Sequence, residues 1–156
     1  MKGLIQRVSE ASVTVQGERI AAIGSGLLLL LGVENGDSEA EAKELCRKIL
    51  TYRVFPDEAG RMNRSLESIG GELLVVPQFT LTADTSSGTR PGFSHAAKPE
   101  EANHLIGLFV AQARAGLGDE KVGEGRFGTH MRVGLVNDGP VTFLLEVRQR
   151  HGESVR

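Results

Sequence analysis

Hydrophobic and polar positions alternate at the start of the chain before giving way to a continuous apolar run. The alternation covers residues 4–8 and 13–15 and returns over residues 19–23, after a turn at residues 16–18. A period of two predicts an N-terminal meander of strands with one buried face. The run LLLLLGV at residues 27–33 is shorter than the roughly 20 apolar residues of a membrane span and therefore predicts a strand inside a sheet.

Two later segments have the spacing of amphipathic helices. Ser38 and Glu41 form an S-x-x-E capping box, which predicts a helix over residues 38–52. Pro99 suits the first position of a second helix, which extends to about residue 115. The inward positions are Ala42, Leu45, Cys46 and Ile49 in the first helix and Ala102, Leu105, Ile106, Phe109 and Ala113 in the second. Because Cys46 lies on such a stripe, we interpret it as a core residue rather than a catalytic thiol.

Further strands are predicted over residues 72–81, 121–126 and 130–137. The stretch LVNDGPVTFLL at residues 135–145 has the pattern of two strands joined by a tight turn at Asp138-Gly139. Pro140 is unexpected there, because it removes a ladder donor where the second strand would begin. Residues 57–71 are rich in turn formers, and residues 82–98 show no periodicity, which indicates a functional loop or disorder.

Two helices among many sequential strands predict a single α+β domain. We assign residues 1–148 to this domain and residues 149–156, QRHGESVR, to a polar tail. The chain has 156 residues and a net charge of −2, so it lacks the strongly basic character of a protein that neutralises many phosphates, and any nucleic-acid contact must be local. One cysteine and no signal-peptide pattern favour a cytoplasmic location without membrane attachment.

Familiar catalytic motifs are missing from the sequence. It contains no G-x-S-x-G elbow, P-loop, G-x-G-x-x-G after a strand, H-E-x-x-H or cysteine cluster. Hydride transfer, phosphate-loop chemistry and zinc hydrolysis therefore lose support, and we expect neither a cofactor nor a metal. The histidines are scattered and are interpreted as surface or loop residues: His95, His104, His130 and His151.

Polar residues interrupt the apolar strand ELLVVPQFTL at residues 72–81. Gln78 and Thr80 would share a face with Leu74 and Val76 in a regular strand. An unpaired buried amide or hydroxyl costs about 1–3 kcal/mol, so these groups either pair within the fold or line a pocket. The structureless segment that follows favours a site, because binding residues concentrate where a rigid strand leads into a long loop.

Two short motifs resemble those of a known family. PQFTL at residues 77–81 is similar to the SQFTL motif, and NDGPVT at residues 137–142 to the N-x-G-P-V-T motif, of D-aminoacyl-tRNA deacylases. The resemblance also covers IQRVSEASVTV, GLLLLLGV, the MN-SL segment at residues 62–66, GGELLVV and the ADT-x5-RP stretch at residues 83–91. Both motifs occur in order within much similar context, which makes the resemblance specific.

The resemblance implies a layered β/β/α fold with mostly antiparallel strands, and a homodimer that acts on tRNA. Such an enzyme hydrolyses the ester between a D-amino acid, or glycine mischarged on tRNA-Ala, and the 3′-terminal adenosine, and spares L-aminoacyl-tRNA. Gly139-Pro140 would be a cis peptide whose tip enters the other subunit's site, with its carbonyls facing the substrate's α-amino group. That contact would leave no room for an L side chain.

The same resemblance assigns roles to single residues. Gln78, Phe79 and Thr80 form the catalytic segment, with main-chain N–H donors around Phe79 and Thr80 and assistance from the ribose 2′-hydroxyl. Phe127 and Met131 match residues that line the adenine pocket, and Arg7 matches the arginine that holds the Gly-Pro tip. From the residues alone, Phe127 and Met131 could equally be core residues, and Arg7 a solvated charge.

One position departs from the family pattern. Pro77 stands where the family usually has serine, and proline supplies neither a hydroxyl nor an N–H. One alternative is a non-catalytic dimer of the same fold that binds RNA or a metabolite, in which Pro77 marks lost activity. A second alternative, independent of Pro77, is a serine hydrolase that uses Ser86, Ser87 or Ser94 with His95. A related deacylase branch also has proline there but differs at the aromatic position, where Phe79 keeps the D-specific pattern.

Overall fold

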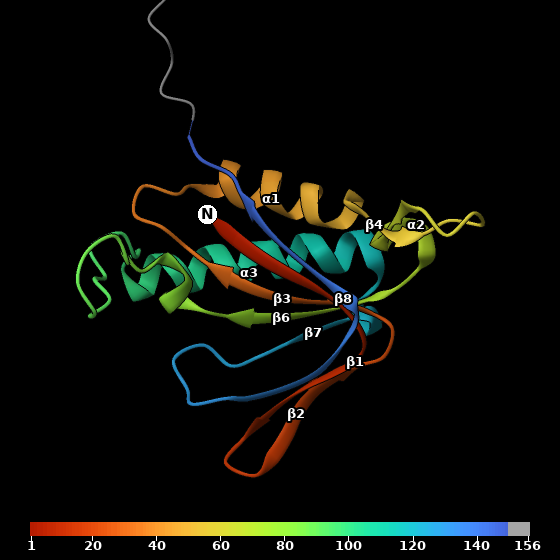
Figure 1. Ribbon diagram of the computed structural model, residues 1–156. Helices are drawn as coiled ribbons and strands as arrows, with labels where there is room; N and C mark the ends of the chain where they lie inside the picture. The colour runs from red at the N-terminus through yellow and green to blue at the C-terminus, as the bar shows by residue number, and fades with distance from the viewer. Residues whose placement is uncertain (150–156) are drawn as a thin grey trace, which may run out of the picture.

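A six-stranded sheet and two long helices account for most of the fold (Figure 1). The computed structural model describes residues 1–149. The strands of the sheet are β1 (Lys2–Val15), β2 (Glu18–Ile23), β3 (Gly26–Gly32), β6 (Glu72–Pro77), β7 (Val122–Glu124) and β8 (Arg132–Glu146). Their order is β2-β1-β3-β6-β7, and β8 also pairs with β1. The predicted tail at residues 149–156 lies outside the described residues except for Gln149.

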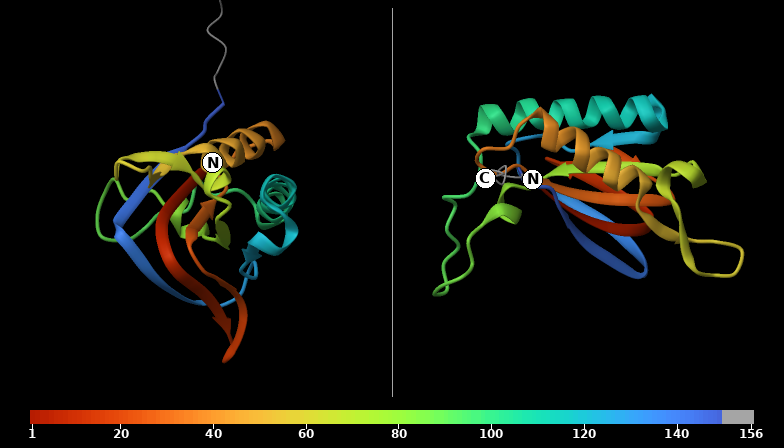
Figure 2. Two further views of the ribbon diagram at one scale, coloured as in Figure 1. Left: turned by 90° about the vertical axis from the view of Figure 1, so that its right-hand side faces the viewer. Right: turned by 90° about the horizontal axis from the view of Figure 1, so that it is seen from above.

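Both long helices lie on one side of the sheet (Figure 2). Helix α1 (Glu39–Thr51) lies in the connection from β3 to β6, and α3 (Pro99–Leu117) in the connection from β6 to β7. Each connection joins two parallel strands, which requires a crossover over the sheet. Because both crossovers move in the same direction across the sheet, the usual right-handed connection places both helices on the same face.

Two hydrophobic clusters fill the two faces of β3 and β6. Toward the helices, Leu29 and Val75 pack with residues of α1 and α3. On the opposite face, Leu28 and Leu74 pack against the second half of β1 and against β2. This arrangement explains why both strands are apolar at nearly every position, and it confirms the predicted interior strands and the α+β fold.

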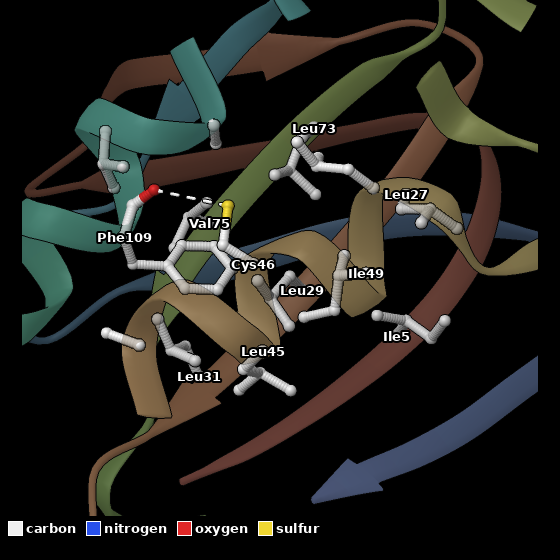
Figure 3. Close-up of a cluster of buried hydrophobic side chains, with 14 of the residues drawn as sticks. Ile5, Leu27, Leu29, Leu31, Leu45, Cys46, Ile49, Leu73, Val75 and Phe109 are labelled. Atoms are coloured by element: carbon white, nitrogen blue, oxygen red, sulfur yellow. Dashed lines mark hydrogen bonds between the residues drawn. The ribbon is translucent and has the colours of Figure 1, made fainter. Parts of the chain in front are cut away.

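The two predicted helices are confirmed with their inward stripes. Ser38 is the N-cap of α1 and forms the predicted capping box with Glu41, while Pro99 opens α3. Cys46 is fully buried beside the Phe109 carbonyl (Figure 3). Burial raises the pKa of the Cys46 thiol to about 12, which fits a core residue and not a nucleophile.

Several element predictions were wrong in detail. The alternation at residues 4–8 and 13–15 forms one long strand, β1, whereas the predicted return over residues 19–23 is confirmed as β2. The predicted strand at residues 121–126 is the short β7. The turn-rich segment contains a two-stranded sheet of β4 (Arg53–Pro56) and β5 (Met62–Ser65), followed by a helical turn, α2 (Leu66–Ile69). The predicted strand at residues 72–81 ends at Pro77, and a 3-10 turn, η1 (Phe79–Thr82), follows. A second such turn, η2 (Asp119–Lys121), precedes β7.

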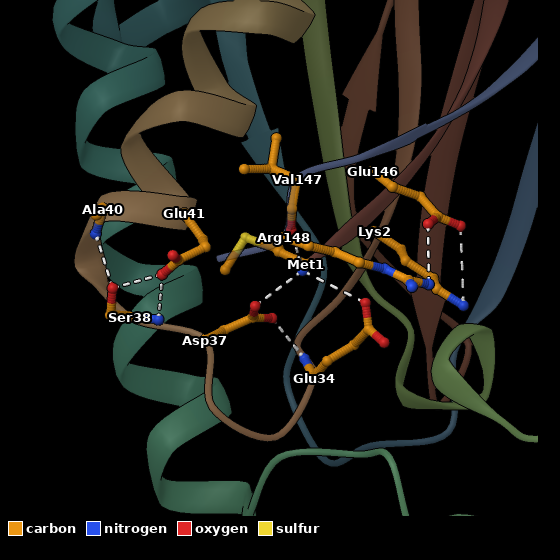
Figure 4. Close-up of polar contacts among 10 residues, drawn as sticks. All are labelled: Met1, Lys2, Glu34, Asp37, Ser38, Ala40, Glu41, Glu146, Val147 and Arg148. Atoms are coloured by element: carbon orange, nitrogen blue, oxygen red, sulfur yellow. Dashed lines mark hydrogen bonds and ion pairs between the residues drawn. The ribbon is translucent and has the colours of Figure 1, made fainter. Parts of the chain in front are cut away.

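The α-amino group of Met1 joins three segments at one end of the sheet (Figure 4). It lies 2.9 Å from Oδ1 of Asp37 and 3.4 Å from Oε1 of Glu34, and it donates to the Val147 carbonyl at 2.7 Å. Burial raises the pKa of Asp37 although hydrogen bonds from this amino group and from Glu34 oppose the shift. These contacts fasten β1, the segment before α1 and the end of β8 together.

No helix within residues 1–149 combines the length and apolar character needed to cross a membrane.

Candidate functional site

A pocket of about 580 Å³ lies where β3 and β6 end against the first turns of α3. Its walls come from the ends of both strands, the turn after β6, the start of α3, the loop before β8 and the beginning of β8. Residues predicted for the site that line it are Gln78, Phe79, Phe127 and Met131. The structure therefore brings together two parts of the predicted site that lie about fifty residues apart in sequence.

The turn after β6 is built by close backbone contacts. The Gln78 N–H donates to the Leu31 carbonyl at 2.8 Å, so Gln78 continues the pairing with β3 while Phe79 turns away. The Thr82 hydroxyl donates to the Phe79 carbonyl at 2.7 Å and is buried. A Cβ on Gly32 would lie 2.9 Å from Thr82 Cγ2, so the turn needs glycine at this position of β3. Sequence reasoning missed Gly32 and Thr82, because only packing reveals their role.

Pro77 is the last residue of β6 and lies past the residues that pair with β7. Because the Gln78 N–H faces β3, the Pro77 nitrogen faces the opposite neighbour, β7. Pairing with β7 extends only from Leu73 to Val75, so Pro77 lies where the ladder between β6 and β7 has ended. The proline is thus structurally compatible with the site.

Two main-chain donors are free at this turn. Phe79 and Thr80 begin η1, so the turn itself offers their N–H groups no acceptor. Across residues 1–149 neither N–H has another hydrogen-bond partner. The Gln78 amide instead bonds the Thr80 hydroxyl, so the two side chains pair with each other and not along the predicted strand face. Adjacent free N–H groups beside a pocket can stabilise negative charge on a carbonyl oxygen.

Phe127 and Met131 form one wall of the pocket. Both are half-buried, and Met131 Sδ accepts a hydrogen bond from the Arg126 N–H at 3.3 Å. The Gly125 N–H donates to the Val75 carbonyl at 2.8 Å, which anchors the loop on β6. The wall therefore offers an aromatic ring and a thioether, surfaces on which a flat heterocycle packs well.

The NDGPVT motif is a bulge in one strand and not the predicted two-strand hairpin. Gln6 of β1 pairs with Thr142 and Val8 pairs with Asn137, so residues 138–141 of β8 stand opposite Arg7 alone. Both halves of β8 continue antiparallel to β1, and the extra residues protrude. The Gly139-Pro140 bond is cis, as the resemblance implied.

Side chains hold this tip from both sides. The Arg7 Nε donates to the Asp138 carbonyl at 2.9 Å, and its Nη1 donates to the Val54 carbonyl at 2.7 Å. Asn137 Oδ1 accepts the Val141 N–H at 2.9 Å, and its Nδ2 donates to the Thr142 hydroxyl at 3.0 Å. Arg7 is thus a structural ligand of the tip and not a solvated charge. The brace by Asn137 was not foreseen, although the residue belongs to the motif.

The tip and the pocket of one chain lie far apart. Arg7 is in register with Leu27, which is in register with Leu73 at the start of β6, whereas the pocket begins at Pro77. The step along β6 from Leu73 to Pro77 is about 13 Å, and β1 and β3 lie between β8 and β6 in the strand order. The structure therefore does not unite Gly139, Pro140 and Arg7 with the pocket residues of the same chain.

A second hollow, of about 750 Å³, contains Asp84, Ser86 and His95. His95 Nε2 lies 3.8 Å from Asp84 Oδ2, longer than a hydrogen bond. Hydrogen bonds from the Ser86 side chain and backbone lower the pKa of Asp84, so Ser86 faces the carboxylate. Within the described residues, His95 accepts no hydrogen bond from Ser86, Ser87 or Ser94, so the serine-hydrolase alternative lacks a paired nucleophile and base.

The chain is similar to known proteins of one family. The family model described as D-Tyr-tRNA(Tyr) deacylase matches residues 4–146. A D-aminoacyl-tRNA deacylase of Marinobacter nauticus is 71% identical over 150 residues, covering 96% of each chain. One of Aeromonas hydrophila is 58% identical over 147 residues, covering 94% of this chain and all of that one.

Two solved structures share the fold. The c-Myc DNA Unwinding Element Binding Protein superposes with a TM-score of 0.91 at 42% identity, covering 96% of this chain and 100% of that one. A probable eukaryotic D-amino acid tRNA deacylase superposes with a TM-score of 0.83 at 17% identity, covering 94% and 98%, which shows the fold alone. With its family model matched over nearly the whole chain and close relatives of the same description, this protein belongs to the D-aminoacyl-tRNA deacylase family.

Proposed function

We propose that this protein hydrolyses the ester bond of D-aminoacyl-tRNA at the pocket beside η1, and releases the free amino acid and tRNA. The observation that carries the assignment of the site is the pair of free N–H groups of Phe79 and Thr80 next to a wall of Phe127 and Met131. The wall receives the terminal adenine, and the donors face the ester carbonyl that is attached to the same nucleoside. Family membership supports this reaction.

The chemistry needs no protein nucleophile. An aminoacyl ester is already reactive, so water that is held near its carbonyl carbon can add directly. The N–H groups of Phe79 and Thr80 stabilise the oxyanion, and each such donor contributes about 10²–10³-fold to the rate. Collapse of the intermediate breaks the bond to the ribose 3′ oxygen, which takes a proton while the amino acid leaves as the acid. The neighbouring 2′-hydroxyl assists, and the Gln78 and Thr80 side chains hold the segment.

The Gly139-Pro140 tip acts in the pocket of a second subunit under this proposal. Separation of the tip from its own pocket supports an action across subunits. Carbonyls of the tip would contact the α-amino group of the substrate and fill the space that an L side chain needs, whereas a D side chain points away. Glycine, including glycine mischarged on tRNA-Ala, has no side chain to exclude and is therefore accepted.

The outer edge of β8 supports a homodimer. Among the described residues β8 pairs with β1 only, so its other edge carries free backbone groups. Apolar side chains along it are exposed: Leu135 37%, Val136 48%, Phe143 37% and Leu144 49%. An apolar strand edge of this kind is stabilised by a partner chain. Because the tip lies between these residues, association along β8 would carry it toward the partner.

One experiment tests the reaction. Purified protein is incubated with labelled D-Tyr-tRNA, L-Tyr-tRNA and Gly-tRNA-Ala, and the remaining acid-precipitable label is followed. We expect rapid loss of label from the D and glycyl substrates and survival of L-Tyr-tRNA. Equal rates on D and L, or no hydrolysis of either, would refute the proposal. If unreacted D-Tyr-tRNA instead stays bound, the protein is the non-catalytic RNA-binding dimer, and Pro77 marks the lost activity.

A further inference from the structure

Two exposed aromatic rings contact each other at the mouth of the pocket. Phe79 is 61% exposed and Phe93 is 43% exposed, and their ring centroids lie 5.3 Å apart at 48°. Phe79 lines the pocket, whereas Phe93 lies outside the set of lining residues. Phe93 thus extends the aromatic surface away from the pocket. Large apolar side chains exposed together usually mark a binding surface.

Backbone hydrogen bonds hold Phe93 in place. Immediately before it, Gly92 and Asp84 exchange two main-chain bonds of 2.8 and 2.9 Å, which close the loop between η1 and α3. The Phe93 carbonyl accepts the Ala96 N–H at 3.2 Å. A ring on such a braced segment loses little conformational entropy when a ligand covers it.

Positive charge accompanies Phe93 in the same loop. Arg90 and Lys98 are exposed, and neither forms an ion pair among the residues that the structure describes. Lys98 is the N-cap of α3 at the end of this loop, and Glu100 and Glu101 follow in the first turn of the helix. Aromatic rings beside unpaired cations are the surface that proteins offer to single-stranded nucleic acid.

We propose that Phe93 is a stacking platform for the nucleobase that precedes the terminal adenosine of the tRNA. The inference rests on the proposed function, because it starts from an adenine between Phe127 and Met131. The acceptor end of tRNA is an unpaired CCA strand, so its penultimate cytidine emerges from the pocket unstacked. Phe93 offers this base its ring face, and Arg90 and Lys98 contact the adjoining phosphates.

The test compares substrates of different length. D-tyrosyl-adenosine ends inside the pocket, whereas D-tyrosyl-CpA adds the cytidine and one phosphate. The wild type should hydrolyse D-tyrosyl-CpA with the higher kcat/KM. Phe93→Ala should lower kcat/KM for D-tyrosyl-CpA by about 10-fold, chiefly through KM, and leave D-tyrosyl-adenosine unchanged. Phe93→Tyr should restore the preference, because it keeps the ring. Ile69→Ala, which removes another exposed apolar side chain on α2, should change neither substrate.

Other outcomes would contradict the proposed role of Phe93 as a stacking platform. Equal use of both substrates by the wild type, or an equal loss on both in Phe93→Ala, means that Phe93 only supports Phe79. Loss of the dimer in Phe93→Ala means that a second copy of the chain covers the ring. Absence of hydrolysis of either compound by the wild type contradicts the proposed function instead. In that case calorimetric titration with unacylated CpA and adenosine decides, since the platform still requires tighter binding of CpA.

Discussion

The Nε of Arg7 lies 2.9 Å from the carbonyl oxygen of Asp138, and this contact joins β1 to the bulge of β8. The same guanidinium donates to the Val54 carbonyl at 2.7 Å, so one side chain links the tip to β4. Its side chain is only 15% exposed, which limits competition from water. Arg7 therefore holds its side of the tip through several fixed donors, a geometry that lysine cannot reproduce.

We expect Arg7→Met to lower the free energy of unfolding by about 1.5–3 kcal/mol, the value of hydrogen bonds to a charged group. Hydrolysis of D-Tyr-tRNA should fall more than 10-fold in the folded variant, because the tip loses its anchor. Urea unfolding and label release measure the two effects. Arg7→Lys should have a stability and an activity between those of wild type and Arg7→Met, because an ammonium can donate to fewer of the carbonyls. Full activity in a destabilised Arg7→Met protein would mean that anchoring of the tip by Arg7 is not needed for catalysis.

Gly139→Ala should damage the tip directly. Gly139 has a φ of +147°, and an added Cβ would lie 2.7 Å from Cγ2 of Val141, so the bulge must shift. We expect D-Tyr-tRNA hydrolysis to fall and rejection of L-Ala-tRNA to weaken. Gly60→Ala is the matched control: its φ is +79° with nothing within 4 Å, so it strains the backbone far from the site. That variant should lose about 1 kcal/mol of stability and keep its specificity.

Mixing subunits determines where the tip acts. Gly139→Ala chains are combined with chains that carry Gln78→Ala and Thr80→Ala, and the heterodimer is isolated by two different tags. If the tip serves the partner, one of the two sites in the heterodimer has an intact pocket and an intact tip. About half of the wild-type D-Tyr-tRNA hydrolysis per dimer should then return. If a verified heterodimer hydrolyses D-Tyr-tRNA no faster than the two mutant homodimers, each tip acts in the pocket of its own chain.

The capping box predicts a pH-dependent stability difference. Burial tends to raise the pKa of Glu41, but hydrogen bonds from the Ser38 side chain and backbone outweigh it and hold the pKa below 4.5. A lowered folded-state pKa contributes stability above pH 4.5 that is lost as the pH falls through the folded value. Glu41→Gln should therefore be less stable than wild type in urea at pH 7, by about 1 kcal/mol. The gap should shrink below pH 4.5; a constant gap would contradict the assignment.

Cys46 should be inert in the folded protein. Its thiol is buried, and burial raises its pKa to about 12, so almost no thiolate is present near neutrality. A disulfide reagent at pH 8 should label the protein only after urea unfolding. Cys46→Ala should leave D-Tyr-tRNA hydrolysis within a few-fold of wild type. Rapid labelling of the native protein would show that α1 and α3 separate readily.

Single Ser86→Ala, Ser87→Ala and Ser94→Ala variants should each keep D-Tyr-tRNA hydrolysis within a few-fold of wild type. The physical reason is that the proposed reaction uses water and main-chain donors, and Ser86 faces Asp84. Single-turnover rates provide the measurement, with circular dichroism as the control for folding. Complete loss in a folded serine variant would favour a covalent acyl-enzyme. Replacement of the terminal 2′-hydroxyl of the tRNA by hydrogen should abolish turnover.

The sequence by itself determined those elements whose pattern lies within one helical turn or one strand. The capping box at Ser38, the proline at the start of α3 and the stripes of both helices depend on neighbours three or four residues away, and all are confirmed. The apolar runs of β3 and β6 predicted buried strands from neighbouring residues in the same way, and both strands are buried. The family resemblance predicted the site residues Gln78, Phe79, Phe127 and Met131, which line one pocket in the structure.

Only the tertiary structure decided how those segments meet. In the sequence a bulge and a hairpin look alike, because both place turn-forming residues between two apolar runs. The structure shows a bulge, since both halves of β8 pair with β1. Strand β6 ends earlier than the sequence predicted because Gly32 leaves room for Thr82 and Gln78 to approach β3. These residues lie about fifty positions from Gly32 along the chain. Arg7 became a tip ligand, and Phe93 a neighbour of Phe79, through contacts between distant segments. Such contacts leave no periodic trace in the sequence, since their energy depends on packing and not on spacing along the chain.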